Sequence, residues 1–101
     1  MKFVMTLIAA ALFAAPALAM DGAALYKDKT CNACHGPKGD KPLMPNYPKI
    51  AGQNAAYTEQ QMKDIKSGAR NNGQTAAMKG VMHLVNNEEI KVIADYLSKL
   101  K

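Results

Sequence analysis

Hydrophobic residues recur with a helical period near the end of the chain. The apolar positions are Ile90, Ile93, Ala94, Leu97 and Leu100. Their spacing of three or four residues predicts a helix with one buried face. Asn86 is placed to cap the start of this helix, and Glu89 stands three residues later, which is the arrangement of a capping box. The pattern predicts a final helix after Asn86 that packs against the rest of the molecule.

Weaker signals predict two earlier helices. Asp21 can cap a first helix that runs toward residue 31. A second helix is expected from its cap at Asn54 to about Ser67, because Gly68 stands where a left-handed residue commonly ends a helix. No stretch has the alternation of a convincing strand. The fold class expected from these patterns is all-α.

The first nineteen residues have a different composition. Lys2 precedes an uncharged apolar stretch over residues 3–15, and the A-L-A of residues 17–19 presents small residues at the positions that a signal peptidase reads. An uncleaved membrane anchor would need about 20 apolar residues, and this stretch is shorter. We therefore expect 1–19 to be a cleaved secretory signal and 20–101 to be one exported domain, periplasmic in a bacterium, with no stable membrane insertion.

The most specific chemistry in the chain is the pentapeptide Cys31-Asn32-Ala33-Cys34-His35. Cys-x-x-Cys-His is the attachment signature of a c-type haem. Each thiol can add to a vinyl group of the porphyrin, and the histidine that follows is placed to bind the iron. The motif predicts one covalently bound haem c, held by Cys31, Cys34 and His35.

A bare Cys-x-x-Cys also occurs in thioredoxin-like redox sites, in zinc sites and as a disulfide. A thioredoxin-like site needs a βαβ context, which the pattern lacks. A structural zinc needs four ligands, whereas the only other histidine is His83 and there is no third cysteine. A disulfide between Cys31 and Cys34 would leave His35 without a role, so haem attachment is the interpretation that accounts for all three residues.

A haem would also compensate for the small size of the domain. Residues 20–101 are 82 residues, a length with limited capacity to bury a core, and chains of this size usually need a staple. Two thioether bonds and an iron ligand would provide one. We therefore expect folding and haem attachment to be coupled.

A proline-rich loop follows the motif. Residues 36–52 contain four prolines, which exclude a long helix or a central strand. We expect this loop to wrap around the haem. Its apolar residues, which could cover a haem edge, are Leu43, Met44, Tyr47 and Ile50. The carbonyl of a loop proline, with Pro45 as one candidate, would orient the Nδ1 proton of His35.

The ligand on the other face of the iron decides between electron transfer and ligand chemistry. The candidates after the motif are Met44, Met62, Met78, Met82 and His83. Met62 lies in the middle of a predicted helix and is interpreted as core packing. Met78 lies 43 residues beyond His35, so the chain has ample length to pass around the ring, and it is the favoured ligand. Met82, Met44 and His83 stay open, and His83 would give a bis-His site of lower potential.

The charge of the chain is basic. From residue 20 onward there are twelve Lys and Arg and eight Asp and Glu, a net charge of +4. The lysines that flank the proposed haem-binding segments are Lys27, Lys29, Lys38, Lys41 and Lys79. A basic ring at an exposed haem edge would steer an acidic redox partner, although a solvated lysine-rich surface without a target explains the same pattern. Nucleic acid is implausible as a partner of an exported chain.

Four segments together resemble a known family, the small monohaem class I cytochromes c, and within it the bacterial cytochrome c-553 and cytochrome c4-like group. The segments are residues 31–37, 47–53, 66–70 and 90–97. The resemblance covers nearly all of residues 20–101. It implies a small cytochrome c fold with about four helices wrapped around one covalent haem, in which the first and last helices cross with Gly22 against Tyr96.

The same resemblance implies the ligand set. Cys31 and Cys34 hold the haem, His35 is the proximal ligand, and a methionine upstream of the last helix is the distal one. Family members commonly carry that methionine eight residues before the residue that caps the final helix, and Met78 stands eight residues before Asn86.

Two strong axial ligands would leave the iron without an open site. We therefore expect a soluble monomeric one-electron carrier that is not an enzyme and that exchanges electrons with redox proteins through an acidic docking surface on the partner. Two alternatives stay open. The chain would be a haem c subunit of a periplasmic enzyme complex if it co-purified tightly with other proteins, or a ligand-binding haem protein with a labile distal methionine if the reduced form bound carbon monoxide readily.

Overall fold

The computed structural model describes residues 20–101, and the predicted signal peptide lies outside them. The helices of this part are α2 (Gly22–Asp28), α3 (Cys31–His35), α4 (Ala55–Ser67), α5 (Thr75–Met82) and α6 (Asn87–Ser98). The all-α prediction is confirmed, with five helices where about four were expected. Over the same residues, no helix is long and apolar enough to cross a membrane.

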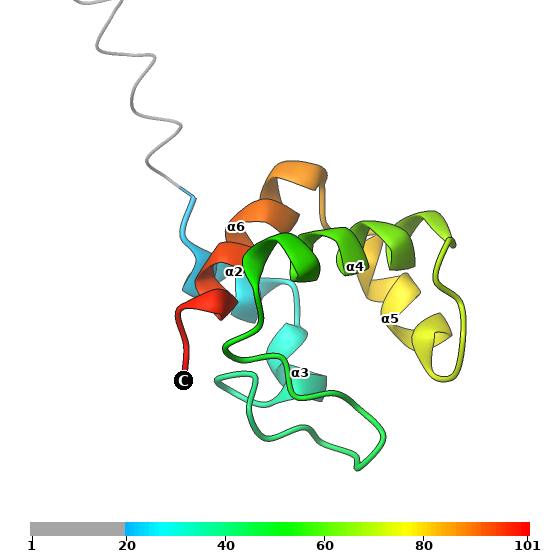
Figure 1. The fold of residues 1–101 in the computed structure, drawn as a ribbon, viewed down its shortest axis with the longest axis horizontal. Coiled ribbons are helices and arrows are strands. Elements are labelled where there is room, and N and C mark those ends of the chain that lie inside the picture. The colour runs from blue at the N-terminus through cyan, green and yellow to red at the C-terminus, as the bar shows by residue number, and fades with distance from the viewer. Residues whose placement is uncertain (1–19) are drawn as a thin grey trace, which may run out of the picture.

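The helices pack around a single core. Helix α6 lies against both α2 and α4, α5 lies against α4, and α3 follows α2 (Figure 1). In Figure 1, α3 and α5 both lie below α4, and the 36–54 loop runs beneath α3 before it rises to the start of α4. The buried apolar residues that form the core cluster are Tyr26, Met62, Ile65, Met82, Val85, Ile90, Ile93 and Leu97. The predicted inner face of the last helix is confirmed, because Ile90, Ile93, Ala94 and Leu97 are each at most 1% exposed.

The predicted caps of the first two helices are present. The Asp21 side chain accepts a hydrogen bond from the backbone N–H of Ala23 (3.0 Å), and the Asn54 side chain accepts one from Tyr57 (3.0 Å). Each cap satisfies a backbone donor that the first turn of a helix would otherwise leave unpaired. Helix α4 ends at Gly68, which takes the left-handed conformation with φ of 92°.

Helices α2 and α6 cross at Gly22, as the family resemblance implied. A Cβ added at Gly22 would lie 2.4 Å from Cβ of Tyr96 and 3.1 Å from the carbonyl oxygen of Val92. Only a residue without a side chain therefore allows this close approach. One turn further along α2, the ring of Tyr26 lies 6.0 Å from the ring of Tyr96. The crossing fixes the helix that leads directly into the Cys-x-x-Cys-His segment.

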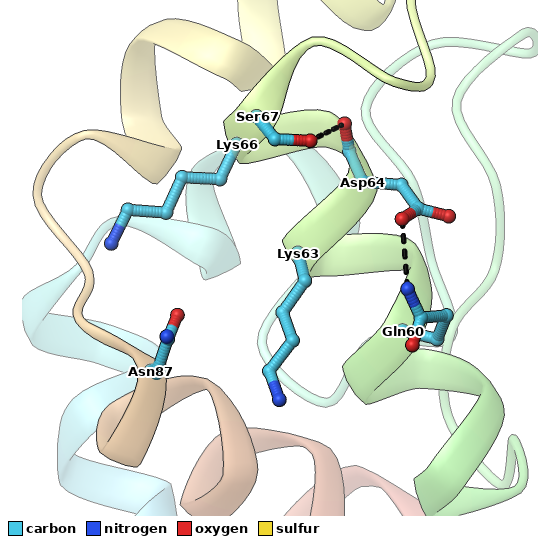
Figure 2. A pocket seen from close by; sticks show the side chains of 6 residues that line it. All are labelled: Gln60, Lys63, Asp64, Lys66, Ser67 and Asn87. Carbon is cyan, nitrogen blue, oxygen red and sulfur yellow. Dashed lines mark hydrogen bonds between the residues drawn. The ribbon is translucent and has the colours of Figure 1, made fainter.

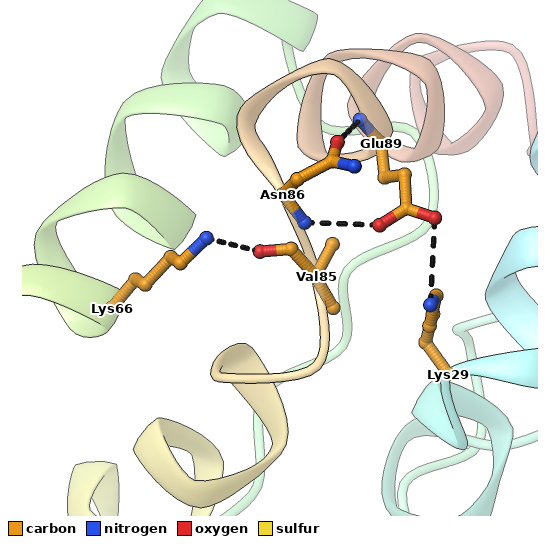
Figure 3. Close-up of polar contacts among 5 residues, drawn as sticks. All are labelled: Lys29, Lys66, Val85, Asn86 and Glu89. Atoms are coloured by element: carbon orange, nitrogen blue, oxygen red, sulfur yellow. Dashed lines mark hydrogen bonds and ion pairs between the residues drawn. The ribbon is translucent and has the colours of Figure 1, made fainter.

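A polar junction fixes the start of α6 (Figure 3). The Asn86 side chain accepts a hydrogen bond from the Glu89 backbone (2.8 Å), and the Glu89 carboxylate accepts one from the Asn86 backbone (3.0 Å), which completes the predicted capping box. The Lys29 ammonium, just after α2, forms an ion pair with the same carboxylate at 3.4 Å. The junction therefore joins the end of α2 to the beginning of α6.

This junction predicts a pH dependence of stability. The Asn86 backbone N–H, and after it the Lys29 ammonium, hold the pKa of Glu89 below its ordinary value. A carboxyl whose pKa is lowered by folding stabilises the folded state fully above its unfolded pKa of about 4.3, and this stabilisation is lost as the pH falls through the lowered folded value. We expect Glu89→Gln to reduce the free energy of unfolding at pH 7 by about 1 kcal/mol and to weaken its decrease below pH 5.

Guanidinium unfolding at pH 7 and at pH 3.5 measures this effect. Glu88→Gln is the matched control, because it removes the same charge from the same first turn of α6 at an exposed position outside the capping box. The account is contradicted if both variants lose the same stability at pH 7.

Candidate haem-binding site

Both cysteines and the histidine lie on the short helix α3. Cys31 and Cys34 are three residues apart on this helix, so their side chains lie on one face, as neighbouring turns of a helix require. Thr30 precedes α3 with a left-handed φ of 64° and separates it from α2. One helical turn therefore presents both thiols to the same side, which is the arrangement that two adjacent vinyl groups need.

His35 is buried and has a defined orientation. Its Nδ1 lies 2.9 Å from the carbonyl oxygen of Pro48. A carbonyl oxygen can only accept a hydrogen bond, so Nδ1 carries the proton, and in the neutral imidazole Nε2 is the nitrogen with the free lone pair. Metal-binding histidines are commonly held in this way, because the hydrogen bond at one ring nitrogen fixes the tautomer and the direction of the other.

The proline suggested from the sequence, Pro45, is not the acceptor. The backbone N–H groups of Ile50 and Ala51 donate to the carbonyl of Gly39 at 2.8 and 3.0 Å, which brings the end of the loop back beside α3. Pro48 lies just before this return, whereas Pro45 lies within the exposed turn that the loop makes at its far end. The acceptor is thus set by backbone pairing between distant parts of the loop.

A second hydrogen bond fixes the chain directly after His35. The hydroxyl of the buried Tyr26 donates to the carbonyl of Gly36 at 2.6 Å. Burial raises the pKa of Tyr26 to about 12, so the hydroxyl stays protonated and remains a donor throughout the physiological range. Gly36 itself has a φ of 88°, and a Cβ there would lie 2.4 Å from the carbonyl oxygen of Lys41. Helix α2 and the loop therefore hold His35 from both sides.

The thiols differ from what a disulfide or a thioredoxin-like site would show. Cys31 and Cys34 are both free, so no disulfide joins them. Burial raises the pKa of the Cys31 thiol to about 11, whereas redox-active cysteines of the thioredoxin type have a lowered pKa. Among residues 20–101, no three His, Cys, Asp or Glu side chains gather in a way that could hold a metal ion. Two free thiols on one face beside an oriented imidazole fit a covalently attached haem.

The five candidates for the distal ligand occupy different environments. Met62 on α4 and Met82 on α5 are buried in the core, at 5% and 1% exposure. His83 is exposed just after α5, and Met44 is exposed in the loop. Met78 is half-buried on α5 and packs against the core cluster, as Cys31 does from α3. Met62 is therefore confirmed as core packing, and Met78 lies at the boundary of the core.

The loop and lysine predictions are met only in part. Ile50 packs against the core cluster, but Leu43 is 71% exposed and Met44 46% exposed. Of the five flanking lysines, Lys29 is paired with Glu89, and the ammonium of Lys79 lies beside Gly68, 3.1 Å from the position a Cβ would take there. The other three, Lys27, Lys38 and Lys41, are exposed.

A surface groove lies between α4 and the start of α6 (Figure 2). Its lining residues are Gln60, Lys63, Asp64, Lys66, Ser67 and Asn87. It contains none of the predicted haem-binding residues. Its polar lining also makes it unsuitable for a porphyrin, which needs an apolar surface.

The fold and the site define an all-α protein in which two free thiols and an oriented histidine fit a covalently attached haem. Residues 19–101 match the family model described as cytochrome c, and the chain belongs to that family. Its cofactor is a covalently bound haem c with its iron.

Known proteins that resemble the chain agree with this family. Cytochrome c-553 of Nitratidesulfovibrio vulgaris is 38% identical over 98 residues, which cover 96% of this chain and 94% of that protein. Cytochrome c4 of Stutzerimonas stutzeri is 35% identical over 96 residues, covering 87% of this chain and 46% of the other. The crystal structure of reduced recombinant cytochrome c4 from Pseudomonas stutzeri superposes with a TM-score of 0.72 at 36% identity, covering 85% of this chain and 50% of that one. The chain thus spans about half the length of the cytochrome c4 proteins that it matches.

Proposed function

We propose that this cytochrome c is a soluble, periplasmic one-electron carrier, active as a monomer, whose haem iron is bound by His35 and Met78. The observation that carries the proposal is the hydrogen bond from Nδ1 of His35 to Pro48, which leaves Nε2 of a buried imidazole free for iron directly beside two free thiols. When bound, a haem iron with two strong axial ligands supplies reversible one-electron oxidation and reduction without an open coordination position.

The residues of the chain support this chemistry by holding the ligand environment constant. The Pro48 carbonyl keeps Nδ1 protonated and makes the imidazole a stronger ligand. Tyr26 holds the Gly36 carbonyl, which resists movement of the backbone next to His35 when the charge of the site changes. His35 is buried and Cys31 packs against the core cluster, so water would be partly excluded from this side of the iron, which favours a higher reduction potential.

Met78 is proposed as the distal ligand in preference to the buried methionines Met62 and Met82, because it can leave its position at a lower cost than they can. Withdrawing the buried Met82 or Met62 toward the iron would empty part of the core, which costs about 2–5 kcal/mol for a large side chain. Met78 lies at the core boundary, on the same face of α5 as Thr75 and Met82, at spacings of three and four residues. The family spacing relative to Asn86 supports the same residue.

Export to the periplasm is proposed from residues 1–19, whose composition is that of a secretory signal. Covalent attachment of a c-type haem needs haem and two free thiols in the same compartment. The Cys-x-x-Cys-His motif of this chain provides both thiols. N-terminal sequencing of the protein purified from a periplasmic fraction tests the proposal, with a first residue at or near Met20 as the expected result.

A carbon monoxide challenge tests the proposed function. We expect the reduced holoprotein to keep its spectrum under carbon monoxide and to titrate reversibly with one electron, because Met78 occupies the sixth position. Ready binding of carbon monoxide would contradict the electron-carrier proposal and favour a ligand-binding haem protein.

The alternative of a subunit in an enzyme complex is favoured by one observation. Leu43 and Met44 are adjacent apolar residues exposed at the tip of the loop that follows the haem motif. Exposed apolar patches commonly mark contacts with other proteins. Sedimentation of the purified holoprotein separates the two proposals, since a carrier sediments with the mass of one chain and a subunit remains in a larger assembly.

The proposed partner is a redox protein with an acidic docking surface. Lys38 and Lys41 are exposed beside the haem motif, where they would meet such a surface. We expect the double variant Lys38→Glu/Lys41→Glu to slow the association with an acidic electron-transfer partner by about tenfold or more at low ionic strength, with the difference reduced at 0.5 M salt.

Stopped-flow oxidation by an acidic partner, with an anionic protein such as plastocyanin as the probe, measures this rate. Lys91→Glu/Lys101→Glu is the matched control, because it makes the same change in net charge at two exposed positions on or after α6. Equal slowing by both double variants would contradict a localised docking surface.

A further inference from the structure

Two lysines connect α4 to α5 and to the segment that follows it. Lys66, near the end of α4, donates a hydrogen bond to the carbonyl of Val85, which lies between α5 and α6 (Figure 3). Lys79 extends from α5 to the C-terminal end of α4, where its ammonium lies beside Gly68. A cation is favourable at the C-terminal end of a helix, because the last carbonyl groups there are unpaired and partly negative. Lys79 thus extends from α5 to the end of α4, and Lys66 ties α4 to the chain just after α5.

Helix α5 depends on such contacts. It has only eight residues, and helices of this length are not stable in water on their own. Its N-cap, Gln74, makes no side-chain capping bond, and the preceding residues 71–74 are exposed. The position of α5 is therefore determined by its buried face and by its connections to α4 and to the start of α6.

The carbonyl that accepts the hydrogen bond from Lys66 belongs to a part of the chain that is held firmly in place. Val85 is 1% exposed in the core, and the next residue is Asn86, whose capping box and Lys29 contact fix the start of α6. A hydrogen bond to the Val85 carbonyl therefore connects α4 to the place where the chain leaves α5. Because a charged donor is involved, this bond is stronger than one between neutral groups.

We propose that Lys66 is a positioning residue for the distal ligand: by holding the Val85 carbonyl it keeps α5 docked, and docked α5 keeps Met78 on the iron. This inference rests on the proposed ligation by Met78. Lys66 itself does not touch the iron site. Its effect is on the fraction of molecules in which α5 has moved away and the sixth coordination position is open.

Imidazole binding to the oxidised holoprotein measures that fraction. Imidazole can bind the iron only when Met78 has left, so its apparent affinity increases in proportion to the open fraction. We expect Lys66→Met to bind imidazole about tenfold more tightly than the wild type, which corresponds to the loss of one charge-assisted hydrogen bond. Lys66→Arg keeps a charged donor and is expected to stay within about twofold of the wild type.

Lys63→Met is the matched control. Lys63 lies one turn earlier on α4 and lines the same groove, as Figure 2 shows, but its ammonium pairs with Glu59 on its own helix at 2.8 Å. This control makes the same chemical change, from a charged to an apolar side chain of similar length. It leaves the hydrogen bond between Lys66 and the Val85 carbonyl in place. We expect its imidazole affinity to stay within about twofold of the wild type.

Three outcomes would overturn the inference. Equal imidazole affinities of Lys66→Met and Lys63→Met would show that the contact with Val85 does not position α5. An increase in Lys66→Arg equal to that in Lys66→Met would show that the hydrogen bond is not the cause. If the oxidised wild type lacks the far-red sulfur-to-iron absorption band, the proposed Met78 ligation fails first, and the role of Lys66 fails with it.

Discussion

Replacement of Met78 by leucine is expected to abolish the far-red sulfur-to-iron band of the oxidised holoprotein and to let the reduced protein bind carbon monoxide. Leucine keeps nearly the same volume at the boundary of the core but has no thioether, so the fold is retained while the sixth ligand is lost. The reduction potential should also fall, because a thioether ligand favours the ferrous state. Absorption spectra with and without carbon monoxide measure both effects.

Met82→Leu is the control for this experiment. Met82 lies one turn further along α5 and is 1% exposed, so the substitution tests the same helix and the same loss of sulfur within the core. We expect Met82→Leu to keep the far-red band and to cost less than about 1.5 kcal/mol of stability, as volume-conserving core changes usually do. If the band survives in Met78→Leu and is lost in Met82→Leu, the ligand assignment is wrong.

Gly22→Ala is expected to destabilise the holoprotein by about 2–3 kcal/mol, which lowers Tm by about 10 °C or more for a domain of this size. The added methyl group would lie 2.4 Å from Cβ of Tyr96, and a Cβ cannot turn away because it is fixed to the backbone. Helices α2 and α6 must therefore separate. Thermal unfolding followed by circular dichroism measures the change.

Gly80→Ala is the control for the crossing. Gly80 is also a helical glycine, and within the described part of the chain no atom beyond its chain neighbours and the backbone of its own helix lies within 4 Å of the position its Cβ would take. The same substitution should therefore stabilise α5 by about 0.5–1 kcal/mol through helix propensity alone. A Gly22→Ala variant as stable as the wild type would contradict the tight packing of α2 on α6.

Local patterns were sufficient to predict α6. Its apolar stripe has a helical period, and both partners of its capping box lie within four residues, so no knowledge of distant contacts was needed. The caps at Asp21 and Asn54 are local in the same sense. The Cys-x-x-Cys-His segment is equally local, because the chemistry of haem attachment requires three residues at fixed spacing.

Helix α5 was not predicted as a helix, because the features that stabilise it are distant in the sequence. The segment has no side-chain cap and contains Gly80, and both features disfavour a helix in isolation. It becomes helical where its buried face packs on α4 and where Lys66 holds Val85. A 19-residue separation between lysine and carbonyl leaves no signal in a local pattern.

The partner of His35 was missed for a similar reason. The sequence shows several prolines in the loop, each with a carbonyl that could accept the Nδ1 proton. Pro48 is selected because Ile50 and Ala51 pair with Gly39 across the loop. Gly39 is the residue that could have indicated this partner. A buried glycine there permits the close approach of Ile50 and Ala51.

The central claim, a covalent haem bound by His35 and Met78 in a one-electron carrier, is tested most directly by the absorption spectrum of the purified exported protein in both oxidation states. The account predicts a c-type spectrum that survives acid extraction of non-covalent haem, with the far-red sulfur-to-iron band present in the oxidised form and absent after reduction. A protein without covalently bound haem, or an oxidised haem protein without that band, would contradict it.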